Sequence, residues 1–583
     1  MDGGSVNCLI MFTTKKTTLF KVPAKSTGTK QKNTDTGSDS AFVNAGMKST
    51  AITSSGNGAL KYSTTGNPFV DQFGKVGSYK PTVNKKEKTF RSFQEIEKDC
   101  EILWAKNPLN TVRFILYLRM ITRIVTLFSG ISTKVSQKGA EMRYEGQMRM
   151  IWLAQKAPDT FWKNIGLFVS VGSWRDVFQL LSLDIQYNGW DKRTLNWAKF
   201  GNLILTGLEN TNTRDLIKKW LPQIKAKSDC KTVEAQADNI IAKWICSLLY
   251  GAKESSYSYK QYRLLKSSGT AHQWQKLISQ KQFDRIDFAT IHGLALSKMV
   301  RSKFLTNQGL KDKYEAWITK PETSAVKFTG FVHELFAKLP SSLSQVSVAV
   351  RETINKQFAT LVNKAKDNTE RKTNLIVVRD TSGSMGSTAT GTNMSCYDIG
   401  KALALYFSEF LTGKFASAWI EFNSDAQMHQ WRGNTPMEKW YNDNSSFVGS
   451  TNFQSVINLF VRLKNQGIAE SEFPTGILAI SDSEFNPASL GKTNVETALN
   501  TLRKAGFSED YVSNFTIVLW NLQSSYYGNG TGEKFETYGG VPNVYYFSGY
   551  STATVAFLTE NIKNAEELFE AAMSQEILQM VEL

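Results

Sequence analysis

The chain contains little of what most enzyme active sites require. Its 583 residues include four histidines and five cysteines. No histidine stands at a spacing typical of a metal-ligand set or a catalytic triad, and the cysteines form no C-x-x-C pair. The sequence also has no glycine-rich phosphate loop of the Walker or dinucleotide type. These absences predict a protein that is not an enzyme, and the unpatterned cysteines fit a reducing compartment such as the cytoplasm.

Long apolar runs are also missing. Met1–Phe20 has no basic segment followed by a continuous apolar stretch, so no cleavable signal is expected. The most apolar helical stretch, Phe114–Phe128, is interrupted by Arg119 and Arg123. Because a membrane span needs about 20 predominantly apolar residues, we expect no membrane partner.

Charge divides the chain into three segments. The whole carries 69 Lys and Arg against 52 Asp and Glu, a net charge of +17. Residues 1–90 carry +8, residues 91–371 carry +18 and residues 372–583 carry −9. Such asymmetry favours a polyanionic partner for the middle segment, most simply nucleic acid. The alternative is that these lysines merely solvate helix surfaces.

Residues 1–90 read as a low-complexity basic arm. They are rich in Ser, Thr, Gly, Asn and Lys, with few large apolar residues between Ser26 and Asn67. A segment of this composition does not bury a core of its own, so we expect an extended arm with little regular structure. Its charge predicts that it lies across the acidic segment and not on the basic one. The apolar residues that could anchor it are Leu19, Phe20, Phe42, Phe69, Phe73 and Tyr79.

Residues 91–371 are predicted to be helical almost throughout. Apolar residues recur three and four positions apart, as in Met148, Ile151 and Trp152, which is typical of amphipathic helices. The clearest helical stretches are Leu109–Leu127, Arg143–Gln155, Thr160–Val169, Trp174–Leu181 and Thr194–Leu208. Many helices with short connections favour a solenoid of antiparallel pairs, as in HEAT-like repeats.

Residues 372–583 alternate short apolar runs with helical patterns. This alternation predicts a doubly wound, mostly parallel Rossmann-like sheet with helices on both faces. The expected strands are Asn374–Asp380, Ala416–Asn423, Gly476–Asp482, Phe515–Asn521 and Val544–Ser548. The expected helices are Tyr397–Leu411, Phe453–Leu463 and Val495–Lys504, with one or two more within Ala553–Leu583.

Oxygen-bearing side chains follow three of these strands. Asp380, Ser382 and Ser384 come after the first, and Thr451 and Asp482 stand at later positions. Two carboxylates and three hydroxyls form an all-oxygen set, which suits Mg²⁺ or another hard divalent cation. Taken singly, Asp-Thr-Ser-Gly-Ser is also a common turn and Asp482 a common helix cap.

Together these residues resemble the metal-ion-dependent adhesion site of a von Willebrand factor A domain. The pattern runs D-x-S-x-S at Asp380, then G-S-T-N around Thr451, then S-D ending at Asp482. The resemblance implies a metal with an open position that a partner's carboxylate fills. Arg379 departs from it, because an apolar or small residue is usual there. We expect Arg379 either to donate to Asp482 or to turn outward, and a cation beside the site would weaken metal affinity.

A second resemblance links the helical segment to the TROVE-type module of the Ro autoantigen family. It covers roughly residues 95–560 and is strongest to an uncharacterised family with the same two-part plan. The landmarks are Lys138-Gly139, Arg143, Trp152-Leu153-Ala154, Thr160-Phe161, Gly172-Ser173-Trp174-Arg175-Asp176, Phe283–Phe288, Phe331–Leu335, Ser481–Phe485, Leu519–Leu522 and Phe547–Ser551. In that family a basic helical ring holds single-stranded RNA ends and its outer surface holds small structured RNA. The resemblance implies RNA binding within residues 91–371 without assigning individual contacts.

The sequence therefore predicts a non-enzymatic RNA-binding protein, part of a ribonucleoprotein, with a Mg²⁺-dependent protein-interaction module. The alternative is a structural, cargo or auxiliary component of a large assembly such as a virus particle, located within that particle. In that case the arm and the metal site would both make protein contacts.

Overall fold

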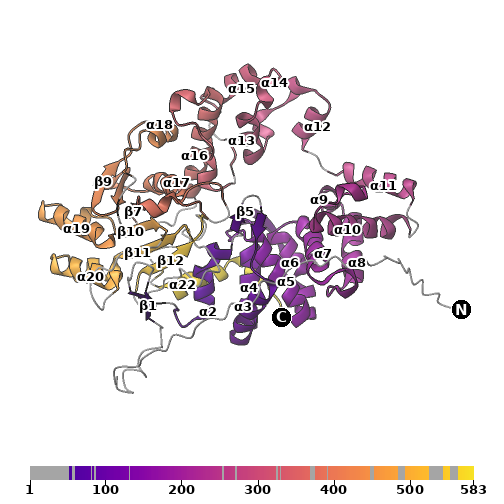
Figure 1. Ribbon diagram of the computed structural model, residues 1–583, viewed down its shortest axis with the longest axis horizontal. Coiled ribbons are helices and arrows are strands. Elements are labelled where there is room, and N and C mark those ends of the chain that lie inside the picture. Colours follow the sequence, from indigo (N-terminus) through magenta and orange to yellow (C-terminus); the bar gives the residue numbers. More distant parts are fainter. Residues whose placement is uncertain are drawn as a thin grey trace.

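The computed structural model describes most of the chain beyond the first 51 residues. The described residues are 52–54, 60–62, 64–79, 82–84, 87–129, 131–251, 255–269, 272–323, 326–328, 330–367, 374–389, 392–446, 449, 452–482, 493–523, 542–551, 562 and 564–583. Within them, a helical region (residues 93–367) precedes a sheet region (residues 374–583), as predicted (Figure 1).

The helical region is built from helices that pack on their near neighbours in sequence. α4 contacts α3 and α5, and α10 contacts α7 and α11, which is the local packing expected of a solenoid. The helices are α3 (Phe93–Lys106), α4 (Pro108–Arg119), α5 (Arg143–Lys156), α6 (Pro158–Val171), α7 (Trp174–Asn188), α8 (Trp197–Glu209), α9 (Arg214–Trp220), α10 (Val233–Tyr250), α11 (Ser256–Ser267), α12 (Gln273–Ser279), α13 (Gly293–Arg301), α14 (Phe304–Asn307), α15 (Lys311–Ile318) and α16 (Val348–Asp367).

One predicted helix in this region is wrong in its second half. The periodicity predicted a helix over Leu109–Leu127, but α4 ends at Arg119. The chain then forms an antiparallel hairpin of β5 (Arg123–Ser129) and β6 (Ile131–Gln137). Both strands are rich in Ile, Val, Thr and Ser. β-branched side chains lose rotamer freedom in a helix and fit a pleated strand, so they favour the hairpin.

The sheet region contains a six-stranded sheet in the order β12-β11-β10-β7-β8-β9. Five strands are parallel, as predicted, and β9 runs antiparallel at one edge. β9 was not predicted because its sequence, Ala-Gln-Met-His-Gln, is largely polar and exposed. The strands are β7 (Leu375–Asp380), β8 (Ala418–Phe422), β9 (Ala426–Gln430), β10 (Gly476–Ser481), β11 (Thr516–Asn521) and β12 (Val544–Ser548).

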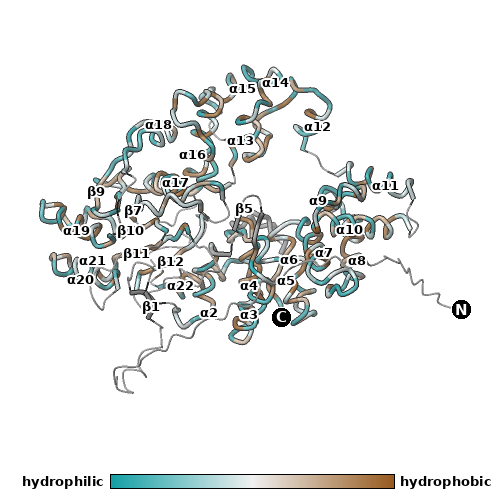
Figure 2. Tube along the Cα trace, in the orientation of Figure 1, coloured by the Kyte–Doolittle hydropathy of each residue, from teal (hydrophilic) through white to brown (hydrophobic). Residues whose placement is uncertain are grey.

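Helices cover both faces of the sheet, so each face buries its own apolar core. Along β7, Val377 points into one core while Ile376 and Val378 point into the other, as strand alternation requires. Figure 2 shows hydrophobic and hydrophilic residues alternating along the covering helices, consistent with amphipathic packing. The helices of the sheet region are α17 (Cys396–Ser408), α18 (Pro436–Tyr441), α19 (Phe453–Asn465), α20 (Asn494–Lys504), α21 (Glu509–Asn514), α22 (Ala565–Met573) and α23 (Glu576–Gln579).

The arm contains more regular structure than its composition predicted. α2 (Pro68–Gly74) and η1 (Val76–Tyr79) bury Phe69 and Phe73, which confirms both residues as anchors. Phe69 and Phe73 lie 5.4 Å and 5.8 Å from Phe569 of α22, measured between ring centroids. Short strand pairs flank this segment: β1 (Ile52–Ser54) with β2 (Leu60–Tyr62), and β3 (Thr82–Asn84) with β4 (Glu87–Thr89).

The arm also contacts the basic helical region, which its charge predicted it would avoid. The Phe73 ring lies 5.4 Å from that of Tyr117 on α4, and the Arg149 guanidinium donates to the Gln72 side chain at 3.0 Å. These contacts are apolar or hydrogen-bonded and place no lysine against a basic surface. Short-range packing therefore outweighs the screened repulsion between net charges. Leu19, Phe20, Phe42 and the side chain of Tyr79 lie outside the described part of the chain.

The C-terminal segment returns to the beginning of the helical region. The Arg113 guanidinium of α4 donates to the Leu578 carbonyl at 3.2 Å, and Asn164 of α6 exchanges hydrogen bonds with the Glu582 backbone. The two regions are therefore joined at both ends of the sheet region. Among the described residues, no helix has both the length and the hydropathy to cross a membrane.

Candidate metal site

The candidate metal site lies where the strand order of the sheet reverses. The chain passes from β7 to β8 and β9 on one side, and from β10 to β11 and β12 on the other. Asp380 ends β7 and Asp482 directly follows β10, its hydrogen-bonded parallel neighbour. The carboxyl ends of parallel strands at such a reversal are the usual ligand sites of open α/β sheets.

Asp380 is the centre of a hydrogen-bonded group of hydroxyls. Its side chain is fully buried, Oδ1 accepts the Ser382 backbone N–H at 2.8 Å, and Oδ2 accepts the Ser481 hydroxyl at 2.5 Å. The hydroxyls of Ser382 and Ser384 lie 3.1 Å apart. The structure thus brings two of the predicted residues, Ser382 and Ser384, together with the Asp380 carboxylate.

The second carboxylate, Asp482, is also buried, with 2% of its surface exposed. Burial and, after it, the negative charge of Asp482 raise the pKa of Asp380 to about 7. Two neighbouring carboxylates in a dry site disfavour each other's ionised form. A divalent cation between them would remove that penalty, so the donor set fits such an ion.

The fifth predicted residue, Thr451, lies outside the described residues. Its neighbour Asn452 is fixed at the end of β8, where its backbone N–H donates to the Asn423 carbonyl at 2.9 Å. Within the described part of the chain, no three His, Cys, Asp or Glu side chains gather as a metal-binding group. The candidate set contains only two carboxylates and otherwise hydroxyls.

Sequence reasoning missed two side chains that support the site. Ser481 donates to Asp380 but was seen only as part of the strand-end motif. Glu421 lies within the buried strand β8 and accepts hydrogen bonds from the Thr381 hydroxyl at 3.0 Å and the Ser446 backbone at 2.7 Å. A lone carboxylate inside the apolar run Ala-Trp-Ile-Glu-Phe was the available signal for Glu421.

Both expectations for Arg379 are wrong. Its guanidinium is fully buried and donates to Asp443 Oδ2 at 2.8 Å, not to Asp482. It also lies over the Tyr397 ring, 4.3 Å from the centroid. Adjacent residues of a strand point to opposite faces, so Arg379 is directed away from Asp380. Asp443, which also pairs with Lys401 at 3.3 Å, offsets part of its positive charge on that face of the sheet.

Most positive charge of the helical region reaches solvent. Of its described Lys and Arg residues, only Arg119 and Arg149 are buried. Arg119 is paired with Asp176 and Arg149 with Glu145. The remaining basic side chains that the structure describes in this region are half-buried or exposed.

Comparisons with known proteins match parts of this architecture. A family described as a domain of unknown function (DUF7788) matches residues 374–581, which include the whole sheet and the candidate metal site. An uncharacterised protein of Acanthamoeba polyphaga mimivirus is 22% identical over 385 residues. That alignment covers 61% of this chain and 63% of the relative, so the chain matches less than two thirds of the relative's length.

Among solved structures, the Ro (RSR) protein of Deinococcus radiodurans is similar to this chain. The TM-score is 0.44 at 12% identity, with 88% of this chain and 100% of that chain covered. The family match is confined to the sheet region.

Proposed function

We propose that this protein is a non-enzymatic RNA-binding protein whose sheet region is a Mg²⁺-dependent protein-interaction module of the von Willebrand factor A type. The observation that carries the proposal is the convergence of Asp380, Ser382, Ser384 and Asp482 at the strand reversal of the sheet. The hydroxyls that contact Asp380 come from serines, and no described histidine or cysteine accompanies them as a general base. The site therefore supplies metal ligands and no nucleophile–base pair.

The ion would be held by Asp380 and Asp482 together with the hydroxyls of Ser382, Ser384 and Thr451. Mg²⁺ prefers such oxygen donors and commonly retains exchangeable water. The ion would supply positive charge at the end of the sheet, to which a partner's carboxylate could bind. The acidic character of the sheet region otherwise repels such a carboxylate, so partner binding would depend on the ion.

We place the proposed RNA-binding surface on the helical region. Residues 91–371 carry a net charge of +18, and almost all of the described basic side chains among them are solvent-accessible. Neutralising phosphates with such side chains releases condensed counterions, which is the main source of non-specific affinity for nucleic acid.

Mg²⁺ titration of the full chain by isothermal calorimetry tests the metal site. We expect one saturable site per chain, and we expect its loss in both Asp380→Ala and Asp482→Ala, because each removes half of the carboxylate charge. The matched control is Asp510→Ala, at an exposed position on α21 in the same region. This variant should bind Mg²⁺ like the parent.

Removing one of two mutually repelling buried carboxylates should leave the fold intact, which circular dichroism without Mg²⁺ will establish. An unchanged Mg²⁺ affinity in Asp380→Ala and Asp482→Ala would show that the ion binds elsewhere. That result would overturn the proposal that the sheet region is a Mg²⁺-dependent protein-interaction module.

Fluorescence anisotropy with a labelled single-stranded RNA tests the second half of the proposal. The logarithm of the association constant should fall linearly with the logarithm of salt concentration, by about 0.7 for each neutralised phosphate. Absence of binding at low salt, or an affinity independent of salt, would overturn the RNA-binding function. If the protein then forms stable oligomers that require residues 1–90, the alternative function, a component of a large assembly, would be supported.

A further inference from the structure

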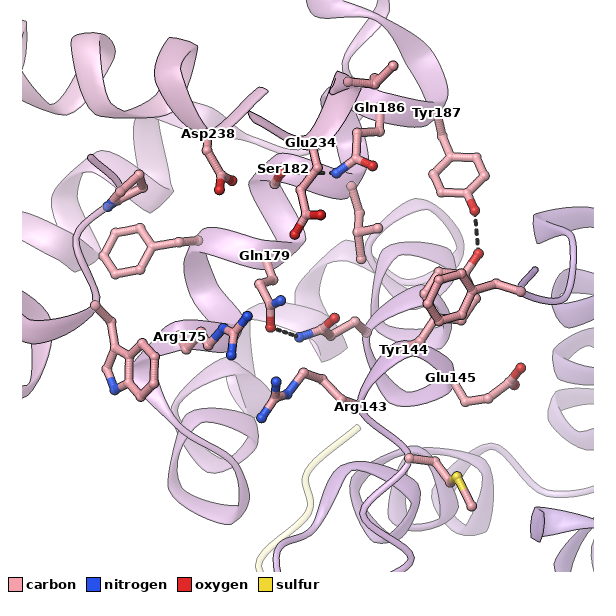
Figure 3. A pocket seen from close by; sticks show the side chains of 18 of the residues that line it. Arg143, Tyr144, Glu145, Arg175, Gln179, Ser182, Gln186, Tyr187, Glu234 and Asp238 are labelled. Carbon is pink, nitrogen blue, oxygen red and sulfur yellow. Dashed lines mark hydrogen bonds between the residues drawn. The ribbon is translucent and has the colours of Figure 1, made fainter. Parts of the chain in front are cut away.

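The helical region contains a cavity of about 1010 Å³ between α5, α7, α9 and α10 (Figure 3). Ligand pockets commonly measure roughly 300–1,000 Å³, so the cavity is large enough for a nucleotide. It lies far along the chain from the candidate metal site and no part of the proposed metal chemistry uses it.

Two arginines face this cavity without a carboxylate partner. Arg143 begins α5 and Arg175 is the second residue of α7, and in Figure 3 both guanidinium groups point into the same part of the cavity. Among the described residues neither forms an ion pair; Arg175 lies over the Trp220 ring, 5.5 Å from its centroid. Burial, and then the positive charges of Arg119 and Arg175, lower the pKa of Arg143.

Asp176, the residue after Arg175 in α7, is already committed to other partners. Asp176 accepts two hydrogen bonds from the Arg119 guanidinium, at 2.7 and 2.6 Å. It also accepts the Gln147 amide at 2.6 Å and the Ser173 backbone N–H at 2.8 Å. Asp176 therefore neutralises Arg119 and leaves the charges of Arg143 and Arg175 for a ligand.

The N-terminus of α5 adds to this positive potential. α5 has 14 residues and begins without a side-chain cap, and its first residue is Arg143. The unsatisfied N–H groups and the dipole of a helix N-terminus favour a bound anion. Together with two planar guanidinium groups, which match phosphate oxygens in a bidentate manner, this part of the cavity has the chemistry of a phosphate site.

The rest of the cavity suits the remaining parts of a nucleotide. Tyr144 and Tyr187 share a hydrogen bond through their hydroxyls and present aromatic surface. The carboxylates of Glu234 and Asp238, on α10, lie across the cavity from Arg143 (Figure 3). Aromatic rings stack on bases, and carboxylates accept hydrogen bonds from ribose hydroxyls and base amino groups.

We propose that Arg143 and Arg175 bind one phosphate of a single-stranded RNA, with the attached nucleoside lying toward Tyr144, Tyr187 and α10. This inference rests on the proposed RNA-binding function and deepens it, because it assigns a discrete site where surface charge alone would give diffuse binding. The ligand chemistry is a phosphate monoester or diester on a nucleoside, so a free nucleotide shares it.

The test compares two variants of the full chain that each lose two positive charges. Arg143→Gln with Arg175→Gln alters the cavity, whereas Lys192→Gln with Lys276→Gln alters exposed positions outside it. We expect RNA affinity at fixed salt to fall by at least about 10-fold in the first and by less than about 2-fold in the second, since a bidentate guanidinium–phosphate contact contributes more than an isolated solvated charge. Photocrosslinking with 4-thiouridine-labelled RNA should modify peptides that contain Tyr144 or Tyr187.

Arg143→Lys with Arg175→Lys keeps the charge but loses the guanidinium forks, and its affinity should lie between those of the parent and the glutamine variant. Circular dichroism melts identify any variant that fails to fold; in that case the crosslinking of the parent decides. RNA binding by the parent that is equally reduced in the cavity and control variants would overturn the phosphate site and leave the proposed function standing.

Isothermal titration with adenosine monophosphate and with inorganic phosphate separates the two ligand sources. If the parent binds adenosine monophosphate through these arginines but binds no RNA at low salt, RNA as the ligand is wrong and so is the proposed function. Binding of RNA with crosslinks at Tyr144 or Tyr187 supports both.

Discussion

Replacing Asp176 by Ala is expected to lower the free energy of unfolding by about 3–5 kcal/mol, the usual cost of removing one partner of a buried ion pair. The side chains of Arg119 and Asp176 are 2% and 0% exposed. Without the carboxylate, the Arg119 guanidinium would remain buried with no counter-charge. The same substitution removes the Ser173–Asp176 capping box of α7, which adds to the loss. Urea unfolding followed by circular dichroism measures the change.

The matched control is Asp229→Ala, at an exposed position in the same region. Surface substitutions of this kind usually change stability by less than about 0.5 kcal/mol. If both variants lose the same small amount, the Arg119–Asp176 pair does not stabilise the helical region. Its role would then be confined to keeping Asp176 away from Arg143 and Arg175.

Replacing Phe73 by Ala is expected to release α2 from its docking site. Phe73 is 4% exposed and packs between Tyr117 of α4 and Phe569 of α22. Truncating a buried Phe costs about 3–5 kcal/mol, and 1.4 kcal/mol corresponds to a tenfold change in population. The undocked state should therefore become at least about 100-fold more populated.

Trypsin cleavage after Lys75, which follows α2, measures this population when reclosing is faster than cleavage. We expect the cleavage rate of Phe73→Ala to rise by about the same factor. Tyr257→Ala truncates an aromatic side chain that is 69% exposed, and cleavage after Lys75 should not change in it. Equal cleavage in parent and Phe73→Ala would mean that α2 does not protect the chain in solution.

The same cleavage assay at several protein concentrations shows which chain α2 docks on. If the protection is the same at all concentrations, α2 docks within its own chain.

These contacts give the arm a defined role in joining the two regions. Besides its aromatic contacts, the η1 segment donates the Gly77 N–H to the Ser548 hydroxyl at 2.8 Å, and that hydroxyl donates to the Gly74 carbonyl at 2.7 Å. A Cβ on Gly77 would lie 2.0 Å from the Ser548 backbone carbon, so only glycine permits this approach. The end of β12 and the arm are therefore packed against each other directly.

Local patterns in the sequence predicted much of the candidate metal site. Asp380 and Asp482 each come at the end of an apolar run, which predicts that both lie at strand ends. Ser382 and Ser384 stand two and four residues after Asp380, in the turn that follows its strand. The supporting residues were harder to identify. Glu421 accepts a hydrogen bond from Thr381, which directly follows the neighbouring strand β7, and this pairing depends on strand order and register. Strand alternation alone would have directed Arg379 to the opposite face, but its partner Asp443 lies 64 residues away and only packing reveals it.

The sequence by itself determined the helical and sheet regions, the five parallel strands to within about two residues and the residues at the strand ends. These features follow from hydrophobic periodicity and turn chemistry, which act over a few residues. Only the tertiary structure decided that a seven-residue helix forms in the arm, because so short a helix gains its stability from packing and not from its own propensity. It also decided that Arg143 and Arg175 share a cavity while Asp176 is committed to Arg119, because such pairings depend on how separate helices pack against one another.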